Sequence, residues 1–170
     1  MIRLSKITLT TSVALLLTLI VFNNLTLNMT HFEFIQNVMS MKAVFLENIG
    51  SWRAITSPLL HHLFYGMMVI WQIVATLLCW WGVYQCWHTC TGRAERFNHA
   101  KISAIAGLTL ALLLWMIGFV IGSEWFLMWQ SEIWNGQDHT FRMIMIISII
   151  LIFTSLPDSD HYCLNLDQSG

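Results

Sequence analysis

Four long apolar segments alternate with short polar ones along the chain. They cover residues 7–27, 58–87, 102–123 and 139–156. Each is close to or above the roughly 20 residues that a helix needs to cross the hydrocarbon layer of a membrane. The pattern predicts an all-α membrane protein, in which residues 1–170 form one domain built on a bundle of four transmembrane helices.

The first apolar segment has a basic start, as a secretory signal peptide does. Arg3 and Lys6 precede it, but its apolar run exceeds the roughly 7–15 residues of a signal-peptide core, and no small-residue cleavage site follows. We therefore expect this segment to be retained as the first spanning helix.

The second segment begins with a helix start signal and carries a polar stripe. Ser57 suits the N-cap position, and Pro58 suits the first helical position, where the N–H that it lacks would have no partner. At about 100° per residue, one face collects His61, Tyr65, Gln72, Thr76 and Cys79. We expect this face to point toward the other helices rather than toward lipid.

The loop at residues 28–57 contains a further helix signal. Thr30 and Glu33 have the spacing of a capping box, in which each side chain bonds to the backbone of the other residue. Apolar residues at helical spacing follow, so we expect a short helix over residues 31–41. It is too short to span a membrane, and it either lies in the membrane interface or packs on the spanning helices.

Small residues recur every four positions along the third segment. Ser103, Gly107 and Ala111 form one series, and Gly118 and Gly122 form another. Small residues at this interval let helix backbones approach closely. We therefore expect Gly107, Gly118 and Gly122 to lie in helix–helix contacts.

Tryptophans and basic residues orient the chain in the membrane. Trp125, Trp129 and Trp134 follow the third segment, and tryptophan is enriched where hydrocarbon meets head groups. Four spans put both termini on one side, together with the basic loop at residues 88–101. That side holds Arg3, Lys6, Arg93, Arg96 and Lys101, against Lys42, Arg53 and Arg142 on the other. Because cytoplasmic loops are enriched in basic residues, we expect cytoplasmic termini.

The composition supports a membrane location and argues against nucleic-acid binding. The chain is 56% hydrophobic and 10% charged, whereas soluble domains are about 25% charged. Its net charge is −1, and no basic run or interleaved basic and aromatic patch is present. The lipid bilayer is therefore the expected partner.

Several longer motifs resemble a known family. They are Phe22-Asn-Asn-Leu-Thr26, Phe34-x3-Val38-Met-Ser-Met41, Trp52-Arg-Ala-Ile-Thr-Ser-Pro58, His61-His62, Gly122-x-Glu124-Trp-Phe-x-Met-Trp-Gln-Ser131 and Trp134-Asn-Gly-Gln137. The chain resembles a bacterial family catalogued as predicted small integral membrane proteins of unknown function. The resemblance implies a four-helix protein of the bacterial inner membrane and brings no activity. It includes neither Cys86 nor Cys90.

A layer of polar and aromatic residues is expected at the outer membrane surface. It comprises Trp52, Arg53, His61, His62, Glu124, Trp125, Trp129 and His139. Such a layer suits a metal, a haem edge, a quinone or a lipid head group, because ionisable groups in a membrane need partners. The alternative is a layer that satisfies itself. We expect Glu124 to pair with Arg53 or one of the histidines, and Glu132 to be solvated.

The remaining chemical signals are sparse. Cys86 and Cys90 flank His88 like half of a zinc site, but no second ligand pair follows. Disulfide exchange would need cysteine pairs on the oxidising side of the membrane, whereas the charge pattern places Cys86 and Cys90 on the cytoplasmic side. Cys79 and Cys163 have no obvious partner, and no nucleophile motif, phosphate loop or dinucleotide fingerprint is present.

Three functions follow from these observations. The first is a non-catalytic accessory or structural subunit that associates with a membrane complex or with itself through the small-residue series. The second is binding of a small cofactor, quinone or lipid head group at the outer polar layer. The third is a channel or transporter, which is disfavoured because no broken spanning helix is predicted.

Overall fold

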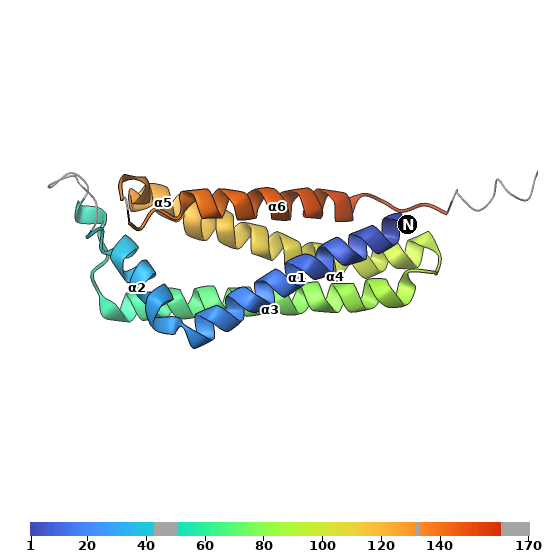
Figure 1. Ribbon diagram of the computed structural model, residues 1–170, viewed down its shortest axis with the longest axis horizontal. Helices are drawn as coiled ribbons and strands as arrows, with labels where there is room; N and C mark the ends of the chain where they lie inside the picture. Colours follow the sequence, from blue (N-terminus) through green and yellow to red (C-terminus); the bar gives the residue numbers. More distant parts are fainter. Residues whose placement is uncertain (43–50, 132, 161–170) are drawn as a thin grey trace, which may run out of the picture.

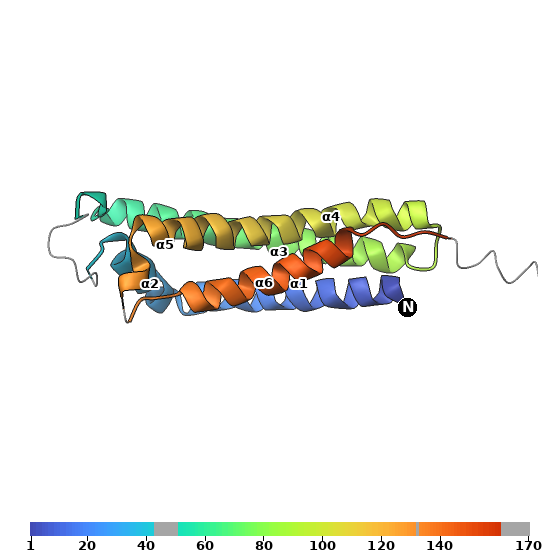
Figure 2. The same cartoon turned by 90° about the horizontal axis from the view of Figure 1, so that it is seen from above.

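The computed structural model describes residues 1–42, 51–131 and 133–160, and these residues form helices and loops without any strand. Four long helices run along one axis (Figures 1 and 2). They are α1 (Ile2–Thr26), α3 (Pro58–Thr89), a continuous helix at Ala94–Trp125, and α6 (Gln137–Ser155). The continuous helix comprises α4 (Ala94–Leu113), the π-helical segment η2 (Leu114–Ile121) and α5 (Gly122–Trp125). The predicted all-α four-helix bundle is confirmed.

All four long helices are long and apolar enough to cross a membrane. Large apolar side chains are exposed on the outside of the bundle, including Leu15, Ile70, Leu77 and Ile149. Exposed apolar side chains in every spanning segment suit contact with lipid, which is as apolar as they are. The protein is therefore an integral membrane protein.

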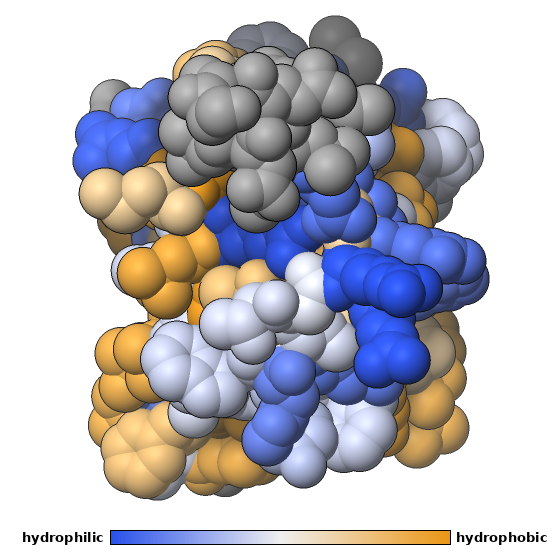
Figure 3. Space-filling view, turned by 90° about the vertical axis from the view of Figure 1, so that its right-hand side faces the viewer, coloured by the Kyte–Doolittle hydropathy of each residue, from blue (hydrophilic) through white to orange (hydrophobic). Residues whose placement is uncertain are grey.

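The two ends of the bundle differ. The end that we call the terminal end carries the N-terminus, the turn between α3 and α4, and residues 156–160 (Figure 1). Hydrophilic residues gather there, with apolar residues around the rim (Figure 3). The opposite end, the α2 end, carries α2 (Asn28–Met39) and the short 3-10 helices η1 (Ser51–Arg53) and η3 (Met128–Gln130).

The third long helix begins eight residues earlier than residue 102, the start that the sequence predicts. The predicted loop at residues 88–101 is therefore wrong, because only residues 90–93 separate the two helices. A helix can continue beyond the hydrocarbon with polar side chains, and Phe97 and Lys101 are buried against the other helices in this extension. Both carboxylate oxygens of Asp160 accept from the Ala94 N–H at 3.0 Å, so Asp160 satisfies one of the free N–H groups of the first turn.

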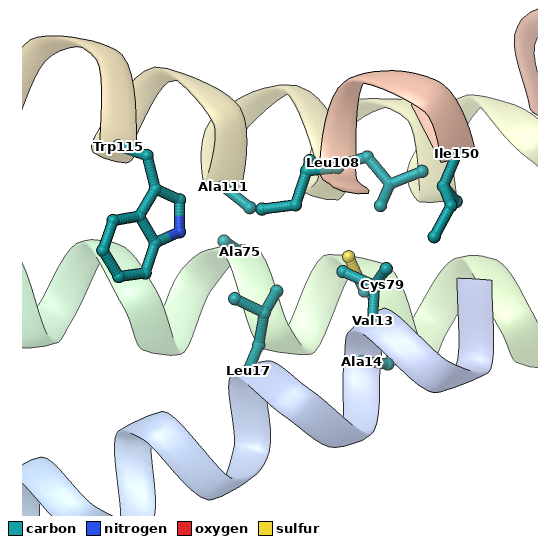
Figure 4. Close-up of a cluster of buried hydrophobic side chains, with 10 residues drawn as sticks. Val13, Ala14, Leu17, Ala75, Cys79, Leu108, Ala111, Trp115 and Ile150 are labelled. Carbon is teal, nitrogen blue, oxygen red and sulfur yellow. The ribbon is translucent and has the colours of Figure 1, made fainter. Parts of the chain in front are cut away.

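The core lies where α1, α3, α4 and α6 meet (Figure 4). Its buried side chains include Leu17, Cys79, Leu108, Trp115 and Ile147. The polar stripe of α3 faces this interior, as predicted, since each of its members is buried or half-buried.

Glycine allows close approach of α3 and α4 at two points. A Cβ atom on Gly107 would lie 2.6 Å from the backbone nitrogen of Cys79, and one on Gly82 would lie 2.3 Å from that of Ala104. The predicted close contact does not occur at Gly118 or Gly122, where the nearest atoms would be 3.9 and 4.0 Å away and belong to the same helix. These two glycines face a cavity instead.

The short helix α2 begins at Asn28, and Leu27 precedes it without a side-chain cap. The predicted capping box of Thr30 and Glu33 is therefore wrong. The helix packs on the spanning helices, because Phe32 stacks on His62 of α3 with ring centroids 4.3 Å apart.

Candidate functional site

The structure brings together three of the residues expected in the outer polar layer. The rings of Trp52 and Trp125 meet edge to face with centroids 5.9 Å apart. The guanidinium of Arg53 lies over both rings, 5.2 and 5.6 Å from their centroids. These cation–π contacts hold η1 against α5 at the α2 end.

Glu124 does not join this group. Its side chain is exposed, and among the described residues it forms no hydrogen bond or ion pair. The expected network of Glu124 with Arg53 or a histidine is therefore wrong. Glu132, which we expected to be solvated, lies outside the described residues.

The three histidines of the expected layer point to different neighbours. His61 is 1% exposed, and its Nε2 atom lies 2.7 Å from the carbonyl oxygen of Ile55. His62 stacks on Phe32, and His139 meets the ring of Trp115 edge to face at 5.7 Å. The expected single site is thus divided among several contacts, and Trp129 is exposed to the surroundings.

A cavity of about 380 Å³ lies at the α2 end between α2, α3 and the π-helical segment. We call it the apolar cavity, because Ser123 supplies the single hydroxyl among the described side chains that line it. Its lining includes Phe34, Met39, Met67, Ile117, Gly118 and Gly122. A π-helix is a rare element that often marks a functional position in a helix.

A second cavity, of about 610 Å³, lies beside it between α1, α2, α3, η2 and α6. We call it the polar-lined cavity. Its hydrogen-bonding side chains are Asn23, Asn24, His31, Gln72, Trp115, His139 and Thr140. Asn24 Nδ2 donates to Gln72 Oε1 at 2.6 Å, and the Tyr65 hydroxyl donates to the Asn24 carbonyl at 2.6 Å, which fixes α1 against α3.

The two cavities share part of their walls. Phe34 and Ile35 of α2, Met68 of α3 and Phe119 of η2 line both. The two cavities are therefore adjacent to one another at these four side chains. Each volume falls within the roughly 300–1,000 Å³ of small-molecule pockets.

The terminal end holds a buried ionic cluster. Lys6 Nζ and Lys101 Nζ lie 2.8 and 2.7 Å from the same oxygen, Asp158 Oδ2, and both donate to the Leu156 carbonyl. Burial alone raises the pKa of Asp158. The hydrogen bonds from Lys101 and Lys6, together with their charges, outweigh that effect and lower the pKa below its usual value.

The sequence gives little sign of this cluster. In the sequence, Lys6 and Lys101 indicate only the orientation of the chain in the membrane, and no pattern assigns a role to Asp158. Their positions at helix ends, all three on the side of the termini, are the one signal that suggests a meeting.

The cysteines do not form a metal site in the part of the chain that the structure describes. Cys79 and Cys86 are buried and Cys90 is half-buried, all as free thiols. No group of three or more potential metal ligands occurs among the described residues. Cys163 lies outside them.

Fold and surface together define a four-helix integral membrane protein. The family model described as "Predicted small integral membrane protein (DUF2165)" matches residues 2–157, and the chain belongs to this family. No curated protein and no solved structure matches the chain.

Proposed function

We propose that the protein is a non-catalytic membrane protein that binds an elongated apolar molecule in its two adjoining cavities. One observation carries this proposal: every buried side-chain polar atom without a partner in the described residues lies in the half of the bundle toward α2. These atoms are Arg53 Nε, His61 Nδ1, Trp115 Nε1, Gln130 Oε1 and Thr140 Oγ1. Buried polar atoms normally have partners, and two of these five residues, Trp115 and Thr140, line the polar-lined cavity, so we expect a ligand there.

An accessory role in a larger membrane complex has less support. That role depends on the small-residue series of the third helix, which would have to contact another protein. Gly107 packs against α3 within the same chain, so it is not available to another protein. Gly118 and Gly122 line the apolar cavity and favour a small molecule there.

The proposed location is a bacterial inner membrane with the terminal end in the cytoplasm. The terminal end carries five basic residues and the α2 end three, among all the Lys and Arg residues of the sequence. The ligand would then enter from the outer half of the bilayer.

Filling the apolar cavity tests the proposal. Gly118→Leu adds a side chain at a position that lines the cavity and has no atom of another helix within 4 Å. Gly66→Leu is the matched control, because Gly66 also has no atom within 4 Å but lines neither cavity. Apolar molecules that copurify in mild detergent are extracted and identified by mass spectrometry.

We expect wild type and Gly66→Leu to retain the same molecule and Gly118→Leu to lose most of it. If all three proteins carry the same molecules in the same amounts, or none carries any, ligand binding in these cavities is refuted. A large complex that copurifies equally with all three would favour the accessory role instead.

A further inference from the structure

The cavity walls restrict the charge of a ligand. Among the described residues, no Lys, Arg, Asp or Glu side chain lines either cavity, and the polar-lined cavity has two titratable side chains, His31 and His139. A cationic head group buried there would have no counter-charge among the described residues, and an anionic one would have only these two histidines. An unpaired charge is among the most unfavourable groups to bury. The described lining therefore favours a neutral head group over a charged one.

The hydrogen-bonding groups restrict the head group further. Thr140 is 1% exposed and Trp115 is 5% exposed, and both line the polar-lined cavity. The Thr140 hydroxyl and the Trp115 N–H have no partner among the described residues. Both groups can donate, and the indole N–H can only donate. The missing partner is therefore an acceptor such as a carbonyl oxygen.

The aromatic side chains indicate a flat ring. Trp115 lies between Phe119, at 4.8 Å between centroids, and His139, at 5.7 Å. Phe34 lies 6.5 Å from Phe119 and completes the wall that the two cavities share. These separations are contacts between the protein's own rings, and a wall of aromatic side chains also favours contact with a further flat ring.

We infer that the ligand is an isoprenoid quinone, with its ring in the polar-lined cavity and its tail in the apolar cavity. This inference rests on the proposed function and specifies its ligand. A quinone ring is neutral and flat and carries carbonyl acceptors at its edge. One carbonyl accepts from the Thr140 hydroxyl, and the tail passes the shared wall at Phe34 and Phe119. The inference concerns binding alone.

Thr140→Val provides a sharp test, because valine has nearly the shape of threonine but lacks the hydroxyl. In the unliganded protein that hydroxyl is buried without a partner, so its removal should leave the thermal unfolding temperature unchanged or raise it. Loss of one hydrogen bond should weaken quinone binding about 5- to 10-fold. Thr154→Val is the matched control, since Thr154 lies on the same helix and its hydroxyl bonds to Thr10 at 3.5 Å, away from both cavities.

Native mass spectrometry of the delipidated protein measures the affinity for decyl-benzoquinone, with decanoate and decanol as chain-matched probes. We expect quinone to bind most tightly, Thr140→Val to weaken it, and Thr154→Val to leave it unchanged. Equal quinone binding by Thr140→Val and wild type, or decanoate binding as tight as quinone binding, overturns the quinone inference. Binding of decanol alone overturns it too but preserves a cavity for apolar molecules. If no probe binds and Gly118→Leu changes nothing, the proposed function itself fails.

Discussion

Replacing Asp158 by asparagine should destabilise the protein more than any single change at its two lysine partners. Lys6 and Lys101 share one carboxylate oxygen at 2.8 and 2.7 Å, and all three side chains are at most 6% exposed. The cluster therefore holds two cations and one anion. Asparagine removes the anion while nearly preserving the shape, and leaves two buried ammonium groups facing each other.

The magnitude follows from that charge count. Removing one partner of a buried ion pair destabilises proteins by about 3–5 kcal/mol, because the remaining charge is uncompensated. Lys101→Met instead leaves Lys6 and Asp158 as a balanced pair. It removes the hydrogen bonds from Lys101 to the Leu156 carbonyl and to Asp158, but both acceptors keep a hydrogen bond from Lys6. We therefore expect a smaller loss, of about 1–3 kcal/mol.

Unfolding in detergent, followed by circular dichroism against increasing SDS, measures these free energies. Asp160→Asn is the control. The Asp160 carboxylate is 57% exposed and pairs with Arg3 at 3.1 Å, and asparagine caps a helix about as well as aspartate. We expect the control to lose less than about 1 kcal/mol. If Asp158→Asn loses no more than the control, or less than Lys101→Met, the argument from buried charge is refuted.

Three further predictions concern pH, packing and topology. Folding lowers the pKa of Asp158, so the carboxylate stabilises the protein fully above its unfolded pKa, near 4. This stabilisation is lost as pH falls through the lower pKa of the folded state. Unfolding measured over a series of pH values should show the loss in wild type and not in Asp158→Asn. Gly107→Leu should prevent folding or sharply lower the unfolding temperature, whereas Gly118→Leu should lower it little, because only Gly107 touches the backbone of Cys79. An impermeant thiol reagent should label Cys90 in opened membranes and not in intact cells; labelling in intact cells would reverse the proposed orientation.

The helices could be predicted from the sequence because lipid imposes a simple requirement on composition. A spanning segment must be apolar over its whole length, and Pro58 marks one start without ambiguity. The predicted start of the third spanning helix, residue 102, is eight residues too late. Hydropathy indicates where a helix crosses lipid, and not where its backbone hydrogen bonds begin. At the true start of α4, the free N–H of Ala94 donates to Asp160, which lies 66 residues away in sequence and so could not be predicted as its partner.

The candidate site was predicted only in part. Trp52, Arg53 and Trp125 could be placed together because aromatic and basic side chains gather at the membrane surface. The cavities could not be predicted, since they depend on how α2 folds back onto α3 and on the π-helical segment. Thr140 in sequence is an ordinary helix residue. Its importance comes from a hydroxyl that burial leaves without a partner.

Buried polar side chains have hydrogen-bond partners at the terminal end of the bundle and lack them at several positions toward the α2 end. This difference bears on function. At the terminal end, Lys6 and Lys101 are buried, and each donates to Asp158 and to the Leu156 carbonyl, which suits a structural role. At the α2 end, Trp115 and Thr140 are buried beside open space with no bond in the described residues. A protein selected for stability alone would fill that space or replace those groups by apolar ones, as Thr140→Val does. Groups that remain unsatisfied next to a cavity therefore support the proposal that a bound molecule satisfies them.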